Sequence, residues 1–235
     1  MRSAGAGPAV RPPFRDRAEA GRVLAGRLGA YAGRPDVLVL ALPRGGVPVA
    51  AEVAAALGAP LDVLVVRKLG VPGQEELAMG AIAGGGTIVV NERVIRQTGL
   101  PPYVLHQVAR RERRELERRE RAYRRRPMPQ VEGRTVLLVD DGLATGSTMR
   151  AAVLALREGI PPGSRPARIV VAVPAASRRT CEELQDEADE VVCAATPDPF
   201  LAVGRAYGRF EQISDDQVRA LLDLPLPAPD GPADG

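Results

Sequence analysis

The sequence predicts an α/β domain with helices on both faces of a five-stranded parallel sheet. The strands, numbered as they occur in the chain, are predicted to lie across the sheet in the order 2-1-3-4-5. Two observations carry this prediction. Apolar runs of strand length alternate with helical segments, and aromatic residues make up only 3% of the chain with no Trp, so Val, Leu, Ala and Ile must build the core. Such a core suits a parallel sheet that is buried on both faces. The strands are predicted at Asp36–Leu42, Leu61–Val66, Thr135–Asp140, Arg168–Val173 and Asp189–Ala194.

Start and stop signals place the other elements between these strands. Asp16 and Glu19 have the spacing of a capping box and predict an opening helix. The Ala- and Val-rich segment Val47–Leu57 predicts a helix after the first strand. An insertion separates the second strand from the third, and within it Met79–Ala83 and Thr87–Asn91 predict a short hairpin around three glycines.

Length and composition bound the domain organisation. A chain of 235 residues with 45% apolar and 26% charged residues is ordinary for one globular domain, although its length allows two. Residues 1–13 are predicted to be a flexible N-terminus and residues 14–223 to form the domain. Residues 224–235 are rich in Pro, Gly and Asp and predict a disordered tail.

The chain lacks the patterns of membrane and secreted proteins. No apolar run approaches the roughly 18 residues that a membrane span needs, and the first residues contain no apolar stretch of a secretory signal. We therefore expect a cytoplasmic protein with no membrane partner. Cys181 and Cys193 form neither a disulfide framework nor a metal-ligand spacing, so both are expected to be reduced thiols.

The positive charge is concentrated in one segment. Between Arg110 and Arg126 there are ten Arg and four Glu, a surplus of six, so the rest of the +3 chain carries about −3. Two interpretations remain open: an exposed helix held by its own ion pairs, and a helix that contacts an anion or a nucleic acid. The i,i+4 pairs are Arg111–Glu115, Arg113–Glu117, Glu115–Arg119, Glu117–Arg121 and Glu120–Arg124.

The segment Val136–Thr148, VLLVDDGLATGST, is the strongest motif. A buried strand leads into two adjacent acids, Asp140 and Asp141, and then into a turn rich in hydroxyls that opens a helix at about Gly146. Adjacent carboxylates can accept hydrogen bonds from the neighbouring hydroxyls of a ribose, and the helix N-terminus can bind a phosphate. The glycines do not fit a Walker A loop, because Ser147 stands where Lys is needed, and G-x-G-x-x-G is absent. The remaining alternative is an ordinary turn with a capping Asp.

This segment closely resembles the phosphoribosyl pyrophosphate (PRPP) signature of type I phosphoribosyltransferases. The resemblance extends over roughly residues 14–220 and is nearest to a group of bacterial phosphoribosyltransferase-domain proteins of uncharacterised function. These proteins share the loop LPRGGVPVA and the stretch RKLG…ELAMGAI. Two parts of the family site, the lid that closes over PRPP and the hood that covers the base, depart here from those of the hypoxanthine, adenine and orotate enzymes. The resemblance therefore implies PRPP binding but does not identify the acceptor.

The family fold would add a hairpin lid at residues 67–91 and a small hood at residues 195–215. The resemblance implies an Mg²⁺-dependent enzyme that transfers phosphoribose from PRPP to a nitrogenous base and releases pyrophosphate. The alternative is a non-catalytic PRPP-binding regulator, associated with nucleic acid through the arginine-rich helix, although we expect no nucleic-acid partner for an enzyme. A homodimer is expected by analogy with relatives.

The resemblance assigns a role to each part of the site. Lys68, Arg44 and the two acids would be catalytic, the acids by holding the ribose and the cations by neutralising the leaving pyrophosphate. Glu76 would organise the lid, and Phe200 would contact the base. Asp140, Asp141 and Asp198 would help to hold Mg²⁺. The residues expected to contact PRPP are Arg44, Gly45, Gly46, Asp140, Asp141, Gly142, Ala144, Thr145, Gly146, Ser147 and Thr148.

Overall fold

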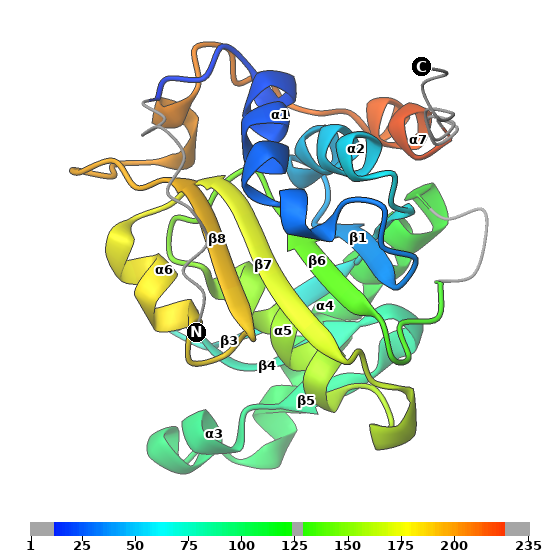
Figure 1. Cartoon of the computed structure of the whole chain (residues 1–235). Helices are drawn as coiled ribbons and strands as arrows, with labels where there is room; N and C mark the ends of the chain where they lie inside the picture. Colours follow the sequence, from blue (N-terminus) through cyan, green and yellow to red (C-terminus); the bar gives the residue numbers. More distant parts are fainter. Residues whose placement is uncertain (1–11, 124–128, 224–235) are drawn as a thin grey trace, which may run out of the picture.

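The computed structural model describes residues 12–123 and 129–223 and contains the predicted five-stranded parallel sheet (Figure 1). Its order is β2-β1-β6-β7-β8, which is 2-1-3-4-5 when only these strands are numbered, so the prediction is confirmed. Adjacent strands pair in parallel at every step. The strands are β1 (Val37–Ala41), β2 (Leu61–Val63), β6 (Thr135–Val139), β7 (Arg168–Ala175) and β8 (Glu190–Ala195).

Alternate residues of the central strands face two separate apolar clusters. Val37 and Val39 of β1 belong to the cluster with α1 (Arg17–Arg27) and α2 (Gly46–Leu57). Leu38 and Leu40 belong to the opposite cluster, and α5 (Ser147–Glu158) and α6 (Arg178–Leu184) cover that face. The predicted helices on both faces are therefore confirmed. This alternation follows from the period of two along a strand.

The insertion forms a second, antiparallel sheet that packs on α5 (Figure 1). The pairing of Gly80–Ile82 with Ile88–Val90 confirms the predicted hairpin. The prediction missed a further strand, because the apolar run Leu61–Val66 is divided between the two sheets: it contributes β2 to the first and the start of β3 to the second. The second sheet contains β3 (Val66–Val71), β4 (Gln74–Ala83) and β5 (Ile88–Val90).

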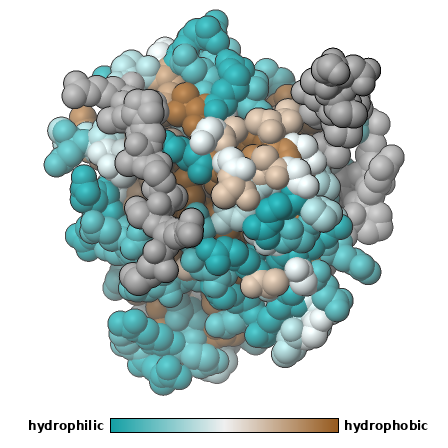
Figure 2. Space-filling model, in the orientation of Figure 1, coloured by the Kyte–Doolittle hydropathy of each residue, from teal (hydrophilic) through white to brown (hydrophobic). Residues whose placement is uncertain are grey.

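The remaining helices lie around this frame. The second half of β4 is buried, whereas its first four residues and the β3–β4 turn are exposed. Hydrophilic side chains cover the end of the molecule that carries α3 (Figure 2). Within the described residues no helix is long and apolar enough to cross a membrane. The helices not yet named are α3 (Glu92–Thr98), α4 (Pro102–Tyr123) and α7 (Asp215–Leu222).

The arginine-rich helix α4 is only partly a solvated helix. Of its predicted i,i+4 pairs, Glu115–Arg119 and Glu117–Arg121 form, whereas Arg124 lies outside the described residues. Arg118 contacts Asp215 of α7 at 3.0 Å. Arg118, which belongs to none of the predicted i,i+4 pairs, therefore ties the helix to the rest of the fold.

The two cysteines correct one prediction. Cys181 in α6 and Cys193 in β8 form a disulfide, with 6.8 Å between their Cα atoms. They were expected to be reduced thiols because a separation of 12 residues matches no framework. The fold brings them together, because α6 packs beside β8, the edge strand that follows it in the chain. The cytoplasmic location stays a prediction.

Candidate functional site

The acidic pair Asp140 and Asp141 lies directly after β6, at the carboxyl end of the sheet. The neighbouring strand β1 leads into the loop with Gly45 and Gly46, because β1 and β6 pair along their whole length. The two loops touch. A Cβ atom on Gly45 would lie 2.1 Å from the Asp141 Oδ2 atom, and one on Gly46 would lie 2.7 Å from the Val139 carbonyl oxygen. The paired glycines are therefore required by the close approach of the two loops.

Arg17, which the sequence analysis did not assign to the site, holds the acidic pair from α1. Its Nε and Nη2 atoms both lie 2.9 Å from Asp141 Oδ2, and Nη1 donates to the Glu211 carbonyl oxygen at 2.8 Å. The guanidinium carbon lies 3.9 Å from the centroid of the Phe210 ring. The Tyr207 hydroxyl donates to the Asp141 carbonyl oxygen. One buried cation thus connects the acids to the segment predicted as the hood.

Burial dominates the electrostatics of the acidic pair. Removal from water, and then the charge of Asp141, raise the pKa of Asp140 well above its usual range. Burial also raises the pKa of Asp141, while Arg17 opposes this effect by favouring the carboxylate. The pair therefore resists carrying two negative charges. Hydroxyl groups of a ligand that donate hydrogen bonds to the acids would reduce this cost.

The turn after the acids forms a small pocket at the N-terminus of α5, with a volume of about 190 Å³. Gly146 has a φ of +72°, which is a left-handed conformation that favours glycine. The Thr180 hydroxyl donates to the Ala144 carbonyl oxygen at 3.0 Å and supports the turn from α6. The N-terminus and the dipole of α5 favour an anion here. The lining includes Asp140, Gly142, Ala144, Thr145, Gly146, Ser147 and Thr148.

The segment predicted as the lid reaches this turn. The Lys68 Nζ atom of β3 lies 2.6 Å from Glu76 Oε1 and 3.1 Å from the Ser147 Oγ atom. The other oxygen of Glu76 accepts from the Thr145 hydroxyl at 2.7 Å. Hydrogen bonding from Lys68, and then from Thr145, lowers the pKa of Glu76. The structure therefore brings together the lid residues and the turn residues that the sequence analysis named.

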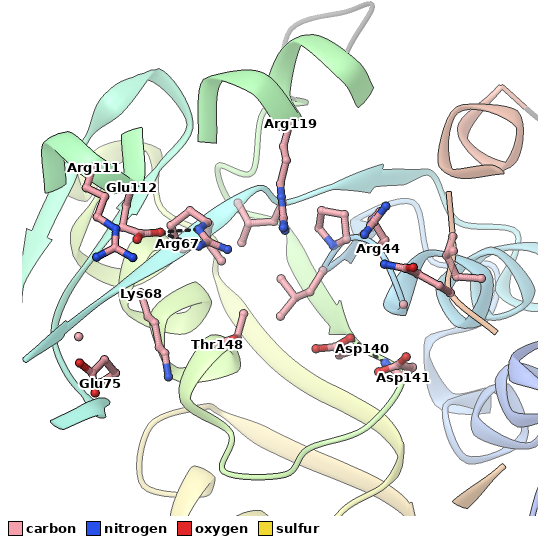
Figure 3. Close-up of a pocket in the computed structure, with 18 of the residues that line it drawn as sticks. Arg44, Arg67, Lys68, Glu75, Arg111, Glu112, Arg119, Asp140, Asp141 and Thr148 are labelled. Atoms are coloured by element: carbon pink, nitrogen blue, oxygen red, sulfur yellow. Dashed lines mark hydrogen bonds and ion pairs between the residues drawn. The ribbon is translucent and has the colours of Figure 1, made fainter. Parts of the chain in front are cut away.

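A cavity of about 740 Å³ extends from the acidic pair to the lid. Figure 3 shows Arg119 pointing into it from α4, with Arg67 and Glu112 joined by an ion pair on the lid side. Arg44 lies at the opposite end, near the acids. Leu64, Val66 and Val108 supply apolar walls. The cations that line the cavity are Arg17, Arg44, Arg67, Lys68, Arg111 and Arg119.

Asp198 and Phe200 do not reach this cavity. They follow β8 along a separate pocket of about 710 Å³ that also includes Pro12 and Pro13, and Phe200 packs against the apolar cluster around Phe14. Both residues therefore lie away from the cavity that the acids and the lid share, and their roles at the base and at the metal ion stay predictions. Phe210 lines the cavity instead, because the chain after β8 packs on the N-terminal segment before it returns to the acids.

The donor set can be compared with the needs of Mg²⁺. The described residues contain no group of three or more His, Cys, Asp or Glu side chains suited to hold a metal ion. Mg²⁺ usually keeps several waters and binds through one or two carboxylates and the phosphates of a substrate. The acidic pair fits that limited role. An ion that arrives with a diphosphate would therefore be compatible with this site.

Residues 16–203 match the family of phosphoribosyl transferase domains. The chain belongs to this family. It is 49% identical over 211 residues to two Mycobacterium tuberculosis proteins, from two different strains, that bear the name "Putative phosphoribosyl transferase". That similarity covers 89% of this chain but only 46% of each relative. The chain thus spans about half the length of these relatives.

A solved structure has the same fold. The chain is similar to the crystal structure of the protein TT1426 from Thermus thermophilus, with 44% sequence identity and a TM-score of 0.81. The match covers 91% of this chain and 98% of that chain. The phosphoribosyl transferase family that the sequence motif predicts is therefore shown by the family match and the relatives.

Proposed function

We propose that this protein is an Mg²⁺-dependent phosphoribosyltransferase, which transfers phosphoribose from PRPP to a nitrogenous base and releases pyrophosphate. One observation carries the proposal: the acidic pair and the loop with Gly45 border a cavity, the hydroxyl-lined turn borders a second pocket, and Asp140 and Thr148 line both. The acids lie at the carboxyl end of the sheet, which is where ligands bind in open α/β sheets. Family membership supports the general reaction.

The chemistry follows from this arrangement. Asp140 and Asp141 would hold the ribose hydroxyls, and the turn before α5 would bind the 5′-phosphate. The bond between the anomeric carbon and the diphosphate breaks as the base nitrogen attacks the opposite face of the sugar. Arg44 would stabilise the leaving diphosphate, and Lys68 is the lid cation predicted to help it. When bound, Mg²⁺ would neutralise part of the diphosphate charge. The base would lie toward Phe210.

The experiment is a pyrophosphate-release assay with PRPP, Mg²⁺ and a panel of purines, pyrimidines and related bases. PRPP affinity is measured beside it for the double variant Asp140→Asn/Asp141→Asn. We expect turnover with one class of base and loss of PRPP binding in the variant. Asp186→Asn, an exposed acid remote from the cavity, is the matched control. Unchanged PRPP affinity in the double variant would refute the assignment of the acids.

A PRPP-binding regulator is the second candidate. Arg110 and Arg114 are exposed on α4, on the part of the helix that does not line the cavity, so a nucleic acid could reach them. PRPP binding without pyrophosphate release from any base would favour this function. It also requires nucleic-acid binding that falls steeply with salt and is lost in an Arg110→Gln/Arg114→Gln variant. The homodimer and the cytoplasmic location remain predictions.

A further inference from the structure

The carboxylate of Glu76 lies among the groups that the proposed function assigns to a phosphate. Its Oε2 atom accepts from the Thr145 hydroxyl at 2.7 Å and from the Ser147 hydroxyl at 3.2 Å. Its Oε1 atom accepts from Lys68 Nζ at 2.6 Å. Both carboxylate oxygens are thus used, and the donors come from the hydroxyl-lined turn and from the lid.

Packing does not hold Glu76 in this position. It lies in the exposed first part of β4, and its side chain is 65% exposed. Its position depends on hydrogen bonds and on the charge of Lys68. Exposed ion pairs of this kind contribute little stability, because water screens them and the side chains lose freedom. Glu76 can therefore leave the turn without unfolding the sheet that carries it.

The same donors suit a phosphate. Hydroxyl groups, an ammonium group and the N-terminus of a helix all stabilise an oxyanion, and they do not distinguish a carboxylate from a phosphate by charge alone. A phosphate has three terminal oxygens and about twice the charge of a carboxylate, so it can satisfy Thr145, Ser147 and the N-terminus of α5 together. A sugar phosphate and Glu76 would compete for one set of donors.

We propose that Glu76 occupies the position of the 5′-phosphate in the ligand-free protein, that a sugar phosphate binds by displacing it, and that Lys68 then donates to that phosphate. This inference rests on the proposed function for the assignment of the turn to a phosphate. It changes the expected role of Lys68, because Nζ lies 3.1 Å from the Ser147 hydroxyl rather than beside Arg44 (Figure 3). The lid is then held closed by an internal anion that the substrate replaces.

The proposal has a quantitative consequence. When only a fraction of the protein is in the form that can bind, the apparent affinity equals the intrinsic affinity multiplied by that fraction. Removal of the Glu76 charge should therefore tighten the binding of ribose 5-phosphate about three- to tenfold. Loss of the Lys68 ammonium group should weaken it about tenfold, as for a charged hydrogen bond. Pyrophosphate has no sugar phosphate to place in the turn, so its affinity should change much less in both variants.

The test measures the affinity of ribose 5-phosphate and of inorganic pyrophosphate by calorimetry. The proteins are the full chain and the variants Glu76→Gln, Glu76→Ala and Lys68→Met. Asp186→Asn is the control, since this exposed acid lines neither the cavity nor the pocket at the turn. Thermal unfolding shows that each variant is folded, which we expect because the lid contacts are exposed.

Tighter ribose 5-phosphate binding in both Glu76 variants, with unchanged binding in Asp186→Asn, supports the proposal. Unchanged or weaker binding in the Glu76 variants overturns it. A Lys68→Met variant that loses pyrophosphate affinity but keeps ribose 5-phosphate affinity overturns the new role of Lys68. If the unmodified chain binds neither ribose 5-phosphate nor PRPP, the proposed function fails together with this inference. If it binds them but the Glu76 variants bind no more tightly, only this inference fails.

Discussion

Replacement of Arg17 by Gln should destabilise the protein and release the acidic pair. The Arg17 side chain is only 9% exposed, and its guanidinium donates to Asp141 and to the Glu211 carbonyl oxygen at 2.8–2.9 Å. The variant leaves the buried Asp141 carboxylate without its cation. Removal of one partner from a buried ion pair costs about 3–5 kcal/mol. That is a large part of the roughly 5–15 kcal/mol that stabilises a domain.

The assay is urea unfolding at several pH values, with Arg15→Gln as the control. Arg15 is 62% exposed and pairs with Asp16, so its loss should cost about 1 kcal/mol or less. Without Arg17 the pKa of Asp141 rises further, so the folded protein holds a proton that the unfolded chain has lost. Stability then falls as the pH rises. We expect a larger loss at pH 8 than at pH 5. A loss below about 1 kcal/mol, or an equal loss at both pH values, would refute this reasoning.

Three further predictions concern stability. The raised pKa of Asp140 should make the protein less stable as the pH rises above the usual range of a carboxyl group, and Asp140→Asn should remove this effect. Unfolding free energies measured from pH 4 to 8 test this prediction. A pH profile equal to that of the unmodified protein contradicts it. Gly45→Ala should cost about 1–3 kcal/mol, because its Cβ atom would meet Asp141, whereas Gly163→Ala has open space and should be nearly neutral. Cys181→Ser opens a bridge between residues 12 apart and should cost about 2–4 kcal/mol. In that variant a reductant should no longer lower the melting temperature, and continued sensitivity would argue against the disulfide.

The strand order could be predicted because two physical signals agree. Apolar runs mark the buried strands, and unusual loops follow Asp36–Leu42 and Thr135–Asp140. Loops at adjacent parallel strands meet at one edge, so the assumption that they share a ligand fixes β1 beside β6. In the structure the two loops are in contact, because Gly45 lies directly against Asp141.

The residues that support the site could not be predicted in this way. Arg17 is one of many arginines, and its contact with Asp141 spans 124 positions along the chain. Phe200 and Phe210 occur in the same aromatic-rich stretch, and only the path of the chain after β8 separates them. Arg17 directly follows the predicted N-cap Asp16, which could have drawn attention to it. Its position in the sequence does not indicate which residue it would contact.

The ion pairs around the cavity indicate which part of the site moves. A carboxylate that neutralises a cation competes with a ligand phosphate for the N–H donors of that cation. Burial decides how easily the phosphate displaces the carboxylate, because buried pairs lose much more than exposed ones when they open. The pairs are Arg17–Asp141, Arg44–Asp215, Arg67–Glu112, Lys68–Glu76 and Arg119–Glu115.

Among these pairs, the partners of Arg17 and Lys68 are the extremes: the side chain of Asp141 is 14% exposed and that of Glu76 is 65% exposed. Arg17 should therefore stay fixed to Asp141 throughout a reaction cycle, whereas Lys68 can exchange its carboxylate for a phosphate. On the proposed function, the Arg17–Asp141 pair would keep the acids in place, and the Lys68–Glu76 pair would open to admit a phosphate. Most of the cations that line the cavity are paired within the protein, so an anionic ligand should have to compete with a carboxylate at each of these cations.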